Sequence, residues 1–281
     1  MSITEFSFKG CLPSPADARD YRVKVAGAVE FPKSFEVQQM PPVKNQKQVN
    51  SCVAHALSSI MEYHDARIGS MKTLSTNFIY GIQNKYCGHS GQGMYLRDAC
   101  KIGLDLGTPW ECYCPGNNEV PKAHEIAEIT YADADKMENA SYFRIASYAR
   151  CRDEKSLKSA LMNYGPVLCS VNWRDTFKID SDGVLYGEDT GDDGYHALVL
   201  YGWNEKGWLI QNSWGSNWGK KGRFILPYTY KFAEAWSIID AEQDIDNSGD
   251  IEIIKPPRNS FMDVIYKIMN IICSLFSQFS K

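Results

Sequence analysis

Four polar side chains in this sequence are of the types that acyl transfer by a thiol requires: Gln46, Cys52, His196 and Asn212. A thiol attacks as its thiolate, and an imidazole can take the thiol proton and later return it to a leaving amine. A glutamine N–H can join the backbone N–H of Cys52 in holding the oxygen that becomes negative. An asparagine oxygen can accept the second ring N–H of His196 without taking its charge, so we expect a thiolate–imidazolium pair at rest.

Each of these residues has a plainer interpretation when it is taken alone. A cysteine at a helix start is more often a small buried hydrophobe, and a loop glutamine is usually solvated. A single strand histidine is more often a satisfied core or surface residue. The hypothesis therefore depends on the fold, which must bring Cys52 from the first half of the chain to His196 from the second.

Hydrophobic periodicity predicts the helix that would carry the thiol. Apolar residues recur at helical spacing over 51–65 and predict one buried face, made of Val53, Ala54, Ala56, Leu57, Ile60 and Met61. The N-terminus of such a helix lowers the pKa of a cysteine placed there. Further helices are predicted over 94–102, stopped by Gly103, and over 154–164, with Asp153 as the N-cap.

The second half of the chain is typical of short strands. Four apolar runs between Gly, Asn and Asp turns predict strands at 167–171, 197–201, 208–211 and 223–226. Residues 204–207 predict a hairpin loop, which would place His196 and Asn212 at the ends of adjacent strands. Trp214 could then shield their hydrogen bond from water. Helices first and strands later indicate the α+β class.

Composition sets the broad class of the protein. A chain of 281 residues allows one large domain or two modest ones and excludes a small stapled scaffold. The formal charge of −4, with 44% hydrophobic and 23% charged residues, is ordinary for a soluble globular chain. Disorder is disfavoured, and nucleic acid is not an expected partner because such partners usually require a basic balance.

The cysteines and the first residues of the chain indicate in which cellular compartment the protein is expected. Nine cysteines, an odd number without a CxxC pair, argue against a disulfide framework and against a zinc module. Cys112 and Cys114 are too close for a comfortable mutual disulfide, so they are free or paired elsewhere. The first residues lack the apolar run of a secretory signal. We expect a cytoplasmic protein, or one exported by a route that the sequence does not show.

The two ends of the chain differ from the body at 31–240. Residues 1–30 are polar and turn-rich and predict an extended arm rather than a core element. An acidic linker at 241–258 precedes an apolar segment at 259–281. The linker copies the first eight positions of a calcium loop but has Lys255 where a bidentate Glu belongs, so a hydrated linker is the better interpretation.

The apolar segment at 259–281 predicts a C-terminal helix. Its apolar residues form a coiled-coil-like seam at Phe261, Ile265, Ile268, Ile272, Leu275 and Phe279. Charged and polar residues interrupt the segment, whereas a spanning helix needs about 20 clean apolar residues, so we do not expect a transmembrane protein. Packing onto the body, self-association and contact with a membrane surface are the open alternatives.

Four sequence blocks in order carry a resemblance to a known family. They are PPVKNQ at 41–46, SCVAHAL at 51–57, GYHALVLYGW at 194–203 and IQNSWGSNWGKKGRF at 210–224. In order, spacing and local chemistry this chain resembles the papain-like (cathepsin-type) cysteine peptidases over about 31–240. Phe31 and the residues after it look like the mature start of many family members.

The resemblance implies both roles and a fold. It implies Cys52 as nucleophile, His196 as general base and then acid, Asn212 as the orienter of His196, and Gln46 with the Cys52 amide as oxyanion hole. It implies a two-lobe α+β fold, with a helical lobe at about 36–140, a β-barrel-like lobe at about 141–240 and the active-site cleft between them. A polypeptide substrate is implied, and no metal or organic cofactor is called for.

The substrate side of the site is implied less directly. The block at 91–94 resembles a family segment whose glycine pairs with the substrate backbone, which makes Gly93 a candidate substrate contact and Met94 a candidate pocket wall. Gly93 could equally be a plain turn residue at a helix entry. Tyr195 and Trp214, each close to a catalytic candidate, are further candidate substrate contacts.

Departures from the family pattern leave questions open. Val49 and Val53 stand where the family commonly has a cysteine and a tryptophan, so substrate preference is not carried over. The arm at 1–30 is too short for the usual helical inhibitory domain. We hypothesise that the arm lies in or near the cleft and restrains activity by intramolecular inhibition. A disordered terminus, or simple packing on the surface of a lobe, is the alternative.

Two other functions remain compatible with the same residues. A transpeptidase or leader-peptide processing enzyme would use the same acyl-enzyme and deliver it to an amine. A retired protease scaffold would act as a binding protein. Each of the four catalytic positions carries the residue type that the reaction requires, which favours a peptidase.

Overall fold

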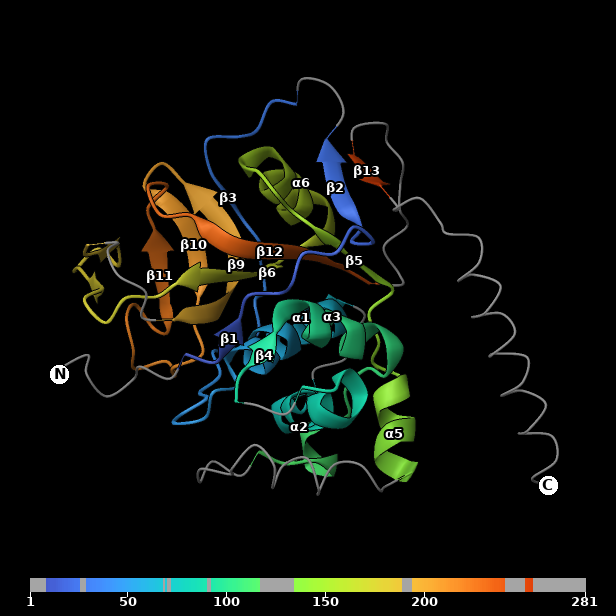
Figure 1. The fold of residues 1–281 in the computed structure, drawn as a ribbon. Coiled ribbons are helices and arrows are strands. Elements are labelled where there is room, and N and C mark those ends of the chain that lie inside the picture. The colour runs from blue at the N-terminus through green and yellow to red at the C-terminus, as the bar shows by residue number, and fades with distance from the viewer. Residues whose placement is uncertain are drawn as a thin grey trace, which may run out of the picture.

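Helices and strands separate into two lobes in the computed structural model (Figure 1). The structure describes residues 9–25, 29–67, 69, 72–89, 92–116, 134–188 and 194–240, together with the backbone of 251–254. The helical lobe contains α1 (Cys52–Arg67), α2 (Thr76–Cys87), α3 (Leu96–Asp105), the 3-10 turn η2 (Glu111–Tyr113) and α5 (Ala134–Ser141). This is the predicted α+β architecture with a helical lobe beside a sheet lobe.

The sheet lobe is built on one 11-stranded sheet. Its main path runs β11 (Arg223–Leu226), β10 (Gly207–Gln211), β9 (Tyr195–Asn204), β6 (Val167–Asn172), β12 (Phe232–Ile239), β5 (Ser147–Arg150), β2 (Arg22–Val25) and β13 (Ile251–Ile254). The short strands β1 (Cys11–Leu12), β3 (Phe35–Glu36) and β4 (Met94–Tyr95) join it off this path. A separate pair is formed by β7 (Lys178–Ile179) and β8 (Leu185–Tyr186), and α6 (Glu154–Tyr164) packs against β12 and β2.

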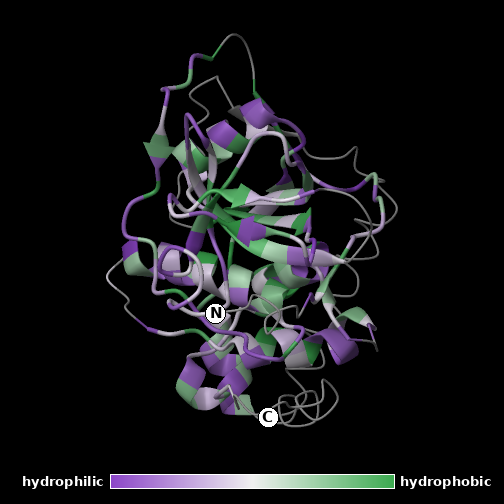
Figure 2. Ribbon diagram, turned by 90° about the vertical axis from the view of Figure 1, so that its left-hand side faces the viewer, coloured by the Kyte–Doolittle hydropathy of each residue, from purple (hydrophilic) through white to green (hydrophobic). Residues whose placement is uncertain are grey.

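Helix α1 lies at the centre of the molecule, between the other helices and the sheet. It contacts α2 and α3 on one side and β9 and β6 on the other. The six residues predicted to form a buried face are all buried, and most other side chains of α1 are buried as well because neighbours pack on more than one side. The small residues Ala54, Ala56, Ser58 and Ser59 allow neighbours to approach from both sides. Figure 2 shows the apolar residues gathered in the strands and on the inner faces of the helices.

Several predicted elements match the structure, and the matches follow local signals. Helix α6 has the predicted bounds and cap, because Asp153 accepts the Ser156 N–H at 2.7 Å and the Ser156 hydroxyl accepts the Asp153 N–H at 3.1 Å. Strand β11 has the predicted bounds, and β10 pairs with β9 across the predicted hairpin loop at 204–207.

The predicted helix over 94–102 is wrong at both ends. Met94 and Tyr95 form β4, which pairs in parallel with β1. The helix continues past Gly103 to Asp105, because Gly103 does not adopt the positive φ with which a glycine ends a helix. The sequence did not predict the helices α2 and α5, the 3-10 turn η2, or the strands β1, β2, β3, β4, β5, β7, β8, β12 and β13.

The prediction that residues 1–30 form an arm outside the core is wrong for two of its segments. Cys11 and Val23 are buried in the two hydrophobic clusters of the body. Strand β2 lies within the sheet between β5 and β13, and β13 itself falls inside the predicted acidic linker at 241–258. The rest of that linker and the predicted C-terminal helix at 259–281 lie outside the described residues.

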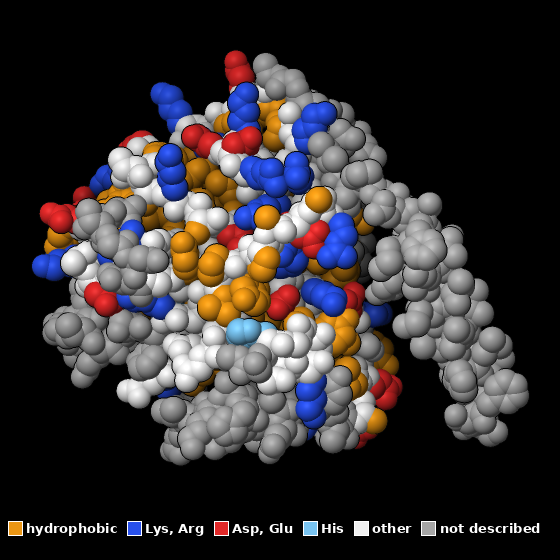
Figure 3. All heavy atoms as spheres, in the orientation of Figure 1, with side chains coloured by type: hydrophobic (Ala, Val, Ile, Leu, Met, Phe, Trp, Pro, Cys, Tyr) orange, Lys and Arg blue, Asp and Glu red, His pale blue; other side chains and the backbone are white. Residues whose placement is uncertain are grey.

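The described residues also show how charge is distributed on one face, whether a helix could cross a membrane, and whether the cysteines form disulfides. On the face shown in Figure 3, side chains of both charges are interspersed with apolar ones. No helix in the described ranges is long and apolar enough to cross a membrane. No disulfide joins the described cysteines, Cys112 and Cys114 among them.

Asp65, near the end of α1, gives a prediction about stability. Its Oδ2 atom is buried and has no hydrogen-bond partner among the described residues. Burial, with the nearby charges of Asp240 and Glu62, raises the pKa of Asp65 to about 7. In an unfolded chain this pKa is about 3.9. From pH 4 to 7 the folded state therefore holds a proton that the unfolded state has lost, and stability falls as the pH rises through this window.

Asp65→Asn is expected to raise the free energy of unfolding at pH 8 by about 1–2 kcal/mol. This is less than the full pKa shift would give, because solvent screens the charge of a partly exposed carboxylate. Near pH 4 the two proteins should be nearly equal, because the folded wild-type carboxyl is then already protonated. Thermal unfolding of both proteins at the two pH values measures the difference. An Asp65→Asn effect of the same size at pH 4 and pH 8 would contradict the ionisation argument.

Candidate active site

Cys52 and His196, which stand far apart in the sequence, are brought to one place by the packing of α1 on β9. Cys52 is the first residue of α1, and the backbone N–H of Ala197 on β9 donates to its Sγ at 3.4 Å. His196 precedes Ala197 on the same strand. Both side chains are fully buried. The thiol therefore lies at a helix N-terminus, next to the strand position that carries the imidazole.

The hairpin of β9 and β10 sets the orientation of His196. Asn212 follows β10, and its Oδ1 lies 2.7 Å from Nε2 of His196. The same Oδ1 accepts the N–H of Ser213 at 2.8 Å, which identifies it as an acceptor and Nε2 as the protonated ring nitrogen. Nδ1 has no hydrogen-bond partner in the described part of the chain. The ring thus keeps an unprotonated nitrogen that can accept a proton.

Aromatic side chains shield this hydrogen bond, as expected for Trp214. The Trp214 ring stacks on the His196 ring with centroids 4.6 Å apart, and Trp173 meets His196 edge-on at 5.5 Å. Trp218 and Phe224 extend the aromatic cluster around Trp173. The sequence analysis did not identify Trp173, which stands just after β6 in a segment without a motif.

Gln46 is held beside the site by the segment that follows Asn212. Its backbone N–H donates to the Ser213 carbonyl at 2.8 Å, and its Oε1 accepts the Ser213 hydroxyl at 2.6 Å. Its Nε2 donates to the Val49 carbonyl at 2.9 Å. The side chain is buried and its amide nitrogen lies on the loop that leads into α1. The four candidates Gln46, Cys52, His196 and Asn212 are therefore gathered at the junction of the two lobes.

A buried ion pair fixes the Gln46 loop to α1, and sequence reasoning missed it. Lys44 Nζ lies 2.6 Å from Oε1 of Glu62, and both side chains are largely buried. Glu62 also accepts the Leu74 N–H at 2.7 Å. Burial raises the pKa of Glu62, and Lys44 opposes that shift. Two residues 18 positions apart thus join the loop before the thiol to the third turn of its helix.

Residues of the N-terminal arm lie directly on the candidate site. We call residues 9–12 the plug. The backbone N–H of Gly10 is near enough to the Cys52 thiol to lower its pKa, and the Gly10 carbonyl accepts the Met94 N–H at 2.8 Å. Cys11 pairs with Met94 on one side and with Tyr195 on the other. The plug therefore crosses the thiol between the two lobes.

Burial under the plug keeps the thiol and the imidazole neutral. Burial raises the pKa of Cys52 to about 11, against the lowering effect of the N–H groups of Ala197 and Gly10. Burial also lowers the pKa of His196 to about 4, although the bond to Asn212 opposes the shift. At neutral pH this arrangement favours a thiol and a neutral imidazole. The expected thiolate–imidazolium pair is not the form of the covered site, because desolvation outweighs the helix N-terminus.

The four candidate substrate contacts have different surroundings. Met94 and Tyr195 pair with the plug through backbone atoms. The Gly93 N–H instead donates to the hydroxyl of Tyr80 at 3.2 Å, and Gly93 has a φ of 85° that favours glycine. A Cβ there would lie 2.9 Å from the Gly10 carbonyl oxygen. Trp214 contacts His196. Tyr80 is a further site residue that sequence reasoning missed.

Comparison with known proteins identifies the family to which this site belongs. The model of the "Papain family cysteine protease" family matches residues 31–235. The chain belongs to this family. The matched range includes all four candidates, Gln46, Cys52, His196 and Asn212, and begins after the plug and β2.

Curated papain-family relatives are moderately similar. Cathepsin K of Mus musculus is 28% identical over 224 residues, covering 74% of this chain and 61% of the relative. A cathepsin L-like peptidase of Aedes aegypti is 27% identical over 215 residues, covering 71% of this chain and 58% of the relative. The chain thus spans about three fifths of the length of these relatives.

Solved structures show the same fold. Xylellain, a cysteine protease from Xylella fastidiosa, superimposes with a TM-score of 0.73 at 23% identity, covering 83% of this chain and 96% of that one. A structure from a study of the mite allergens Blo t 1 and Der p 1 superimposes with a TM-score of 0.65 at 19% identity, covering 85% and 82%. The predicted papain-like two-lobe fold is confirmed.

Proposed function

We propose that this protein is a peptidase that hydrolyses peptide bonds through Cys52. One observation carries the proposal: Cys52 begins α1 and accepts an N–H from the residue beside His196, whose bond to Asn212 leaves Nδ1 without a proton. A helix N-terminus favours a thiolate, and an unprotonated Nδ1 can receive the thiol proton. The papain-family match over residues 31–235 supports the same assignment.

The reaction has two stages, acylation of Cys52 by the substrate and hydrolysis of the resulting thioester. Once the site is open, His196 takes the proton of Cys52, and the sulfur attacks the carbonyl carbon of the substrate. The backbone N–H of Cys52 and the Gln46 amide stabilise the resulting oxyanion. His196 then gives its proton to the leaving amine as the C–N bond breaks and a thioester remains. Water, deprotonated by His196, attacks the thioester, and its proton returns to the sulfur as the carboxylic acid leaves.

We also propose that the plug keeps the peptidase inactive. The supporting geometry is that the backbone of Gly10 lies beside Cys52, while the Gly10 carbonyl accepts the Met94 N–H. The plug also covers the thiol completely and desolvates it, which raises its pKa. A segment in this position blocks the access of a substrate to Cys52.

The test of the proposed function uses protein from which residues 1–19 have been removed. We expect it to hydrolyse unfolded protein substrates and to be labelled at Cys52 by a thiol-reactive epoxide, while Cys52→Ala does neither. A competing amine in the assay separates hydrolysis from transpeptidation, because a transpeptidase would yield mainly the amine adduct. If Cys52 is labelled but no peptide or protein is cleaved, the peptidase assignment is wrong and a binding role is favoured.

A further inference from the structure

We propose that Tyr80 is a positioning residue for the binding of peptide substrates. Its hydroxyl accepts the Gly93 N–H, so the next N–H, that of Met94, is the one that binds a carbonyl of the substrate backbone. This role of Tyr80 rests on the proposed function and deepens it, because it specifies which group of the protein recognises the polypeptide backbone. It differs from the family resemblance, which makes Gly93 the contact with the substrate backbone.

The two consecutive N–H groups of Gly93 and Met94 have partners in different elements. The Gly93 N–H donates to the Tyr80 hydroxyl on α2 at 3.2 Å, and this bond is buried. The Met94 N–H donates to the Gly10 carbonyl of the plug at 2.8 Å. Displacement of the plug therefore frees the Met94 N–H and leaves the Gly93 N–H bonded. An extended peptide that takes the place of the plug can then offer a carbonyl to Met94, as Gly10 does.

The conformation of Gly93 makes this division possible. Its φ of 85° is one that glycine adopts without strain, and a Cβ there would lie 2.9 Å from the Gly10 carbonyl oxygen. The backbone can therefore direct one N–H toward α2 and the next toward the plug. The glycine is thus required by its conformation, which favours the interpretation of Gly93 as a turn residue before a helix.

Tyr80 is well suited to hold a backbone N–H in a fixed position. It is only 2% exposed and belongs to the hydrophobic cluster that also contains Cys52. Burial raises the pKa of Tyr80, and the nearby Cys52 acts in the same direction, so the hydroxyl stays neutral at neutral pH. Because packing of the ring fixes the hydroxyl, loss of this oxygen alone would leave the buried Gly93 N–H without its acceptor.

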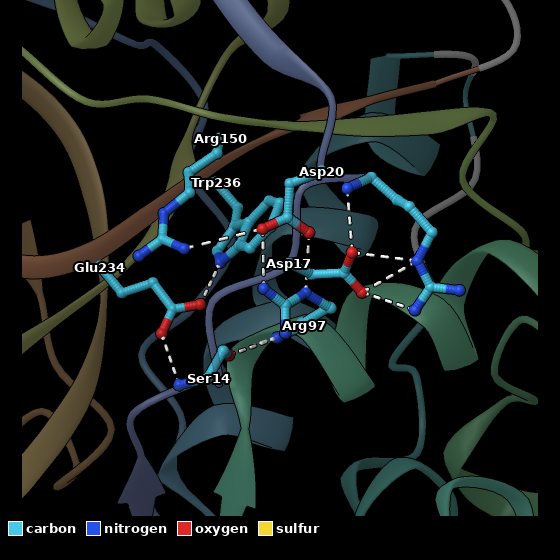
Figure 4. Close-up of polar contacts among 8 residues, drawn as sticks. Ser14, Asp17, Asp20, Arg97, Arg150, Glu234 and Trp236 are labelled. Atoms are coloured by element: carbon cyan, nitrogen blue, oxygen red, sulfur yellow. Dashed lines mark hydrogen bonds and ion pairs between the residues drawn. The ribbon is translucent and has the colours of Figure 1, made fainter. Parts of the chain in front are cut away.

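Other contacts fix the two ends of the segment around Gly93. On one side, Asn50 Nδ2 donates to Gln92 Oε1 at 2.7 Å and joins the segment to the loop before α1. On the other side, Arg97 in the first turn of α3 donates two hydrogen bonds to the buried Asp20, at 2.8 and 2.7 Å (Figure 4). These partners remain when the plug is removed. Loss of the hydroxyl on α2 should therefore change the middle of the segment and leave its ends in place.

The first test uses the full chain and does not depend on activity. Tyr80→Phe should make the Gly93 N–H exchange with solvent about tenfold faster or more, while the Met94 N–H, still bonded to the plug, keeps its wild-type rate. Amide exchange followed by NMR measures both rates. Tyr86→Phe is the matched control, because this hydroxyl of the same helix donates to Asp105 at 2.6 Å and its loss should change neither rate. An unchanged Gly93 rate in Tyr80→Phe overturns the proposal.

The second test measures the effect of the same change on peptide substrates of the protein without residues 1–19. Tyr80→Phe should raise KM by about 3- to 10-fold, the effect of one hydrogen bond, with kcat nearly unchanged. The reason is that a loosened segment no longer holds Met94 in its binding position. If the Gly93 N–H were the donor to the substrate, its release from Tyr80 would instead lower KM. A KM equal to or below that of the parent protein overturns the proposal.

Two controls separate this role from folding and from the proposed function itself. A small amino-acid ester that reaches Cys52 but not the segment around Gly93 should be hydrolysed equally well by Tyr80→Phe, and an equal loss with the ester overturns the positioning role. Binding of the peptides to Cys52→Ala, with and without Tyr80→Phe, gives the affinity when nothing is cut. If Tyr80→Phe weakens binding but the protein with Cys52 intact cuts no peptide, only the proposed function is overturned. Equal or tighter binding overturns the role of Tyr80.

Discussion

Cys52→Ala and His196→Ala are each expected to lower kcat/KM of the protein without residues 1–19 by about 10⁴- to 10⁶-fold. The sulfur supplies the bond to the acyl group, and the imidazole supplies both proton transfers, so loss of either stops the same sequence of steps. The double variant should be no worse than either single one, because the two groups act as a unit. Hydrolysis of a fluorogenic peptide measures all three proteins.

Cys151→Ala is the matched control for this prediction. Cys151 is also a buried free thiol, but it follows β5 and lies in the other hydrophobic cluster. Its replacement should leave kcat/KM within a few-fold of the parent protein. Additive losses in the double variant, or an equal loss in Cys151→Ala, would mean that the assay reports folding and not the chemistry of Cys52 and His196.

The parts of the site that local patterns encode could be predicted from the sequence. Helical spacing after Cys52 places the thiol at the start of a helix, and the hairpin loop before Gly207 places His196 at the end of a strand. The family resemblance then indicates that these two residues act together. The bounds of α6 follow from its Asp153 cap. Helix α2 also has local signals, a Ser75 cap and Gly88 in the left-handed region, and could have been found from them.

The remaining features depend on contacts between distant segments, which no local pattern specifies. The Lys44–Glu62 pair joins the loop before α1 to α1 itself, and the Tyr80 hydroxyl on the Gly93 N–H joins α2 to the segment before β4, so both contacts become visible only in the folded chain. Strand β2 is short, and its neighbours β5 and β13 come from the middle and the end of the chain. The ionisation of Cys52 could not be predicted either, because it depends on whether the plug covers the sulfur.

Gly10→Ala is expected to open the site of the intact chain and to raise its peptidase activity by about 10- to 100-fold. A Cβ at position 10 would lie 2.0 Å from the Asn50 carbonyl oxygen and 2.3 Å from its carbon. These are backbone atoms of the loop before α1, so the plug must shift away from Cys52. A misfit of this size costs about 1–3 kcal/mol or more, which is enough to displace a segment held by a few hydrogen bonds.

The same variant should change the ionisation of Cys52. Burial is the main cause of its raised pKa of about 11, so displacing the plug should lower that pKa, even though the effect of the Gly10 N–H is lost as well. Alkylation of Cys52 should then begin at a lower pH in Gly10→Ala than in the wild type. Ala18→Val, a change at an exposed position between the plug and β2, is the control and should follow the wild-type profile. A Gly10→Ala protein of intact mass that is as inactive and as slowly alkylated as the wild type would show that the plug does not control the thiol. A fast, intact one would show that displacement of the plug is enough to open the site.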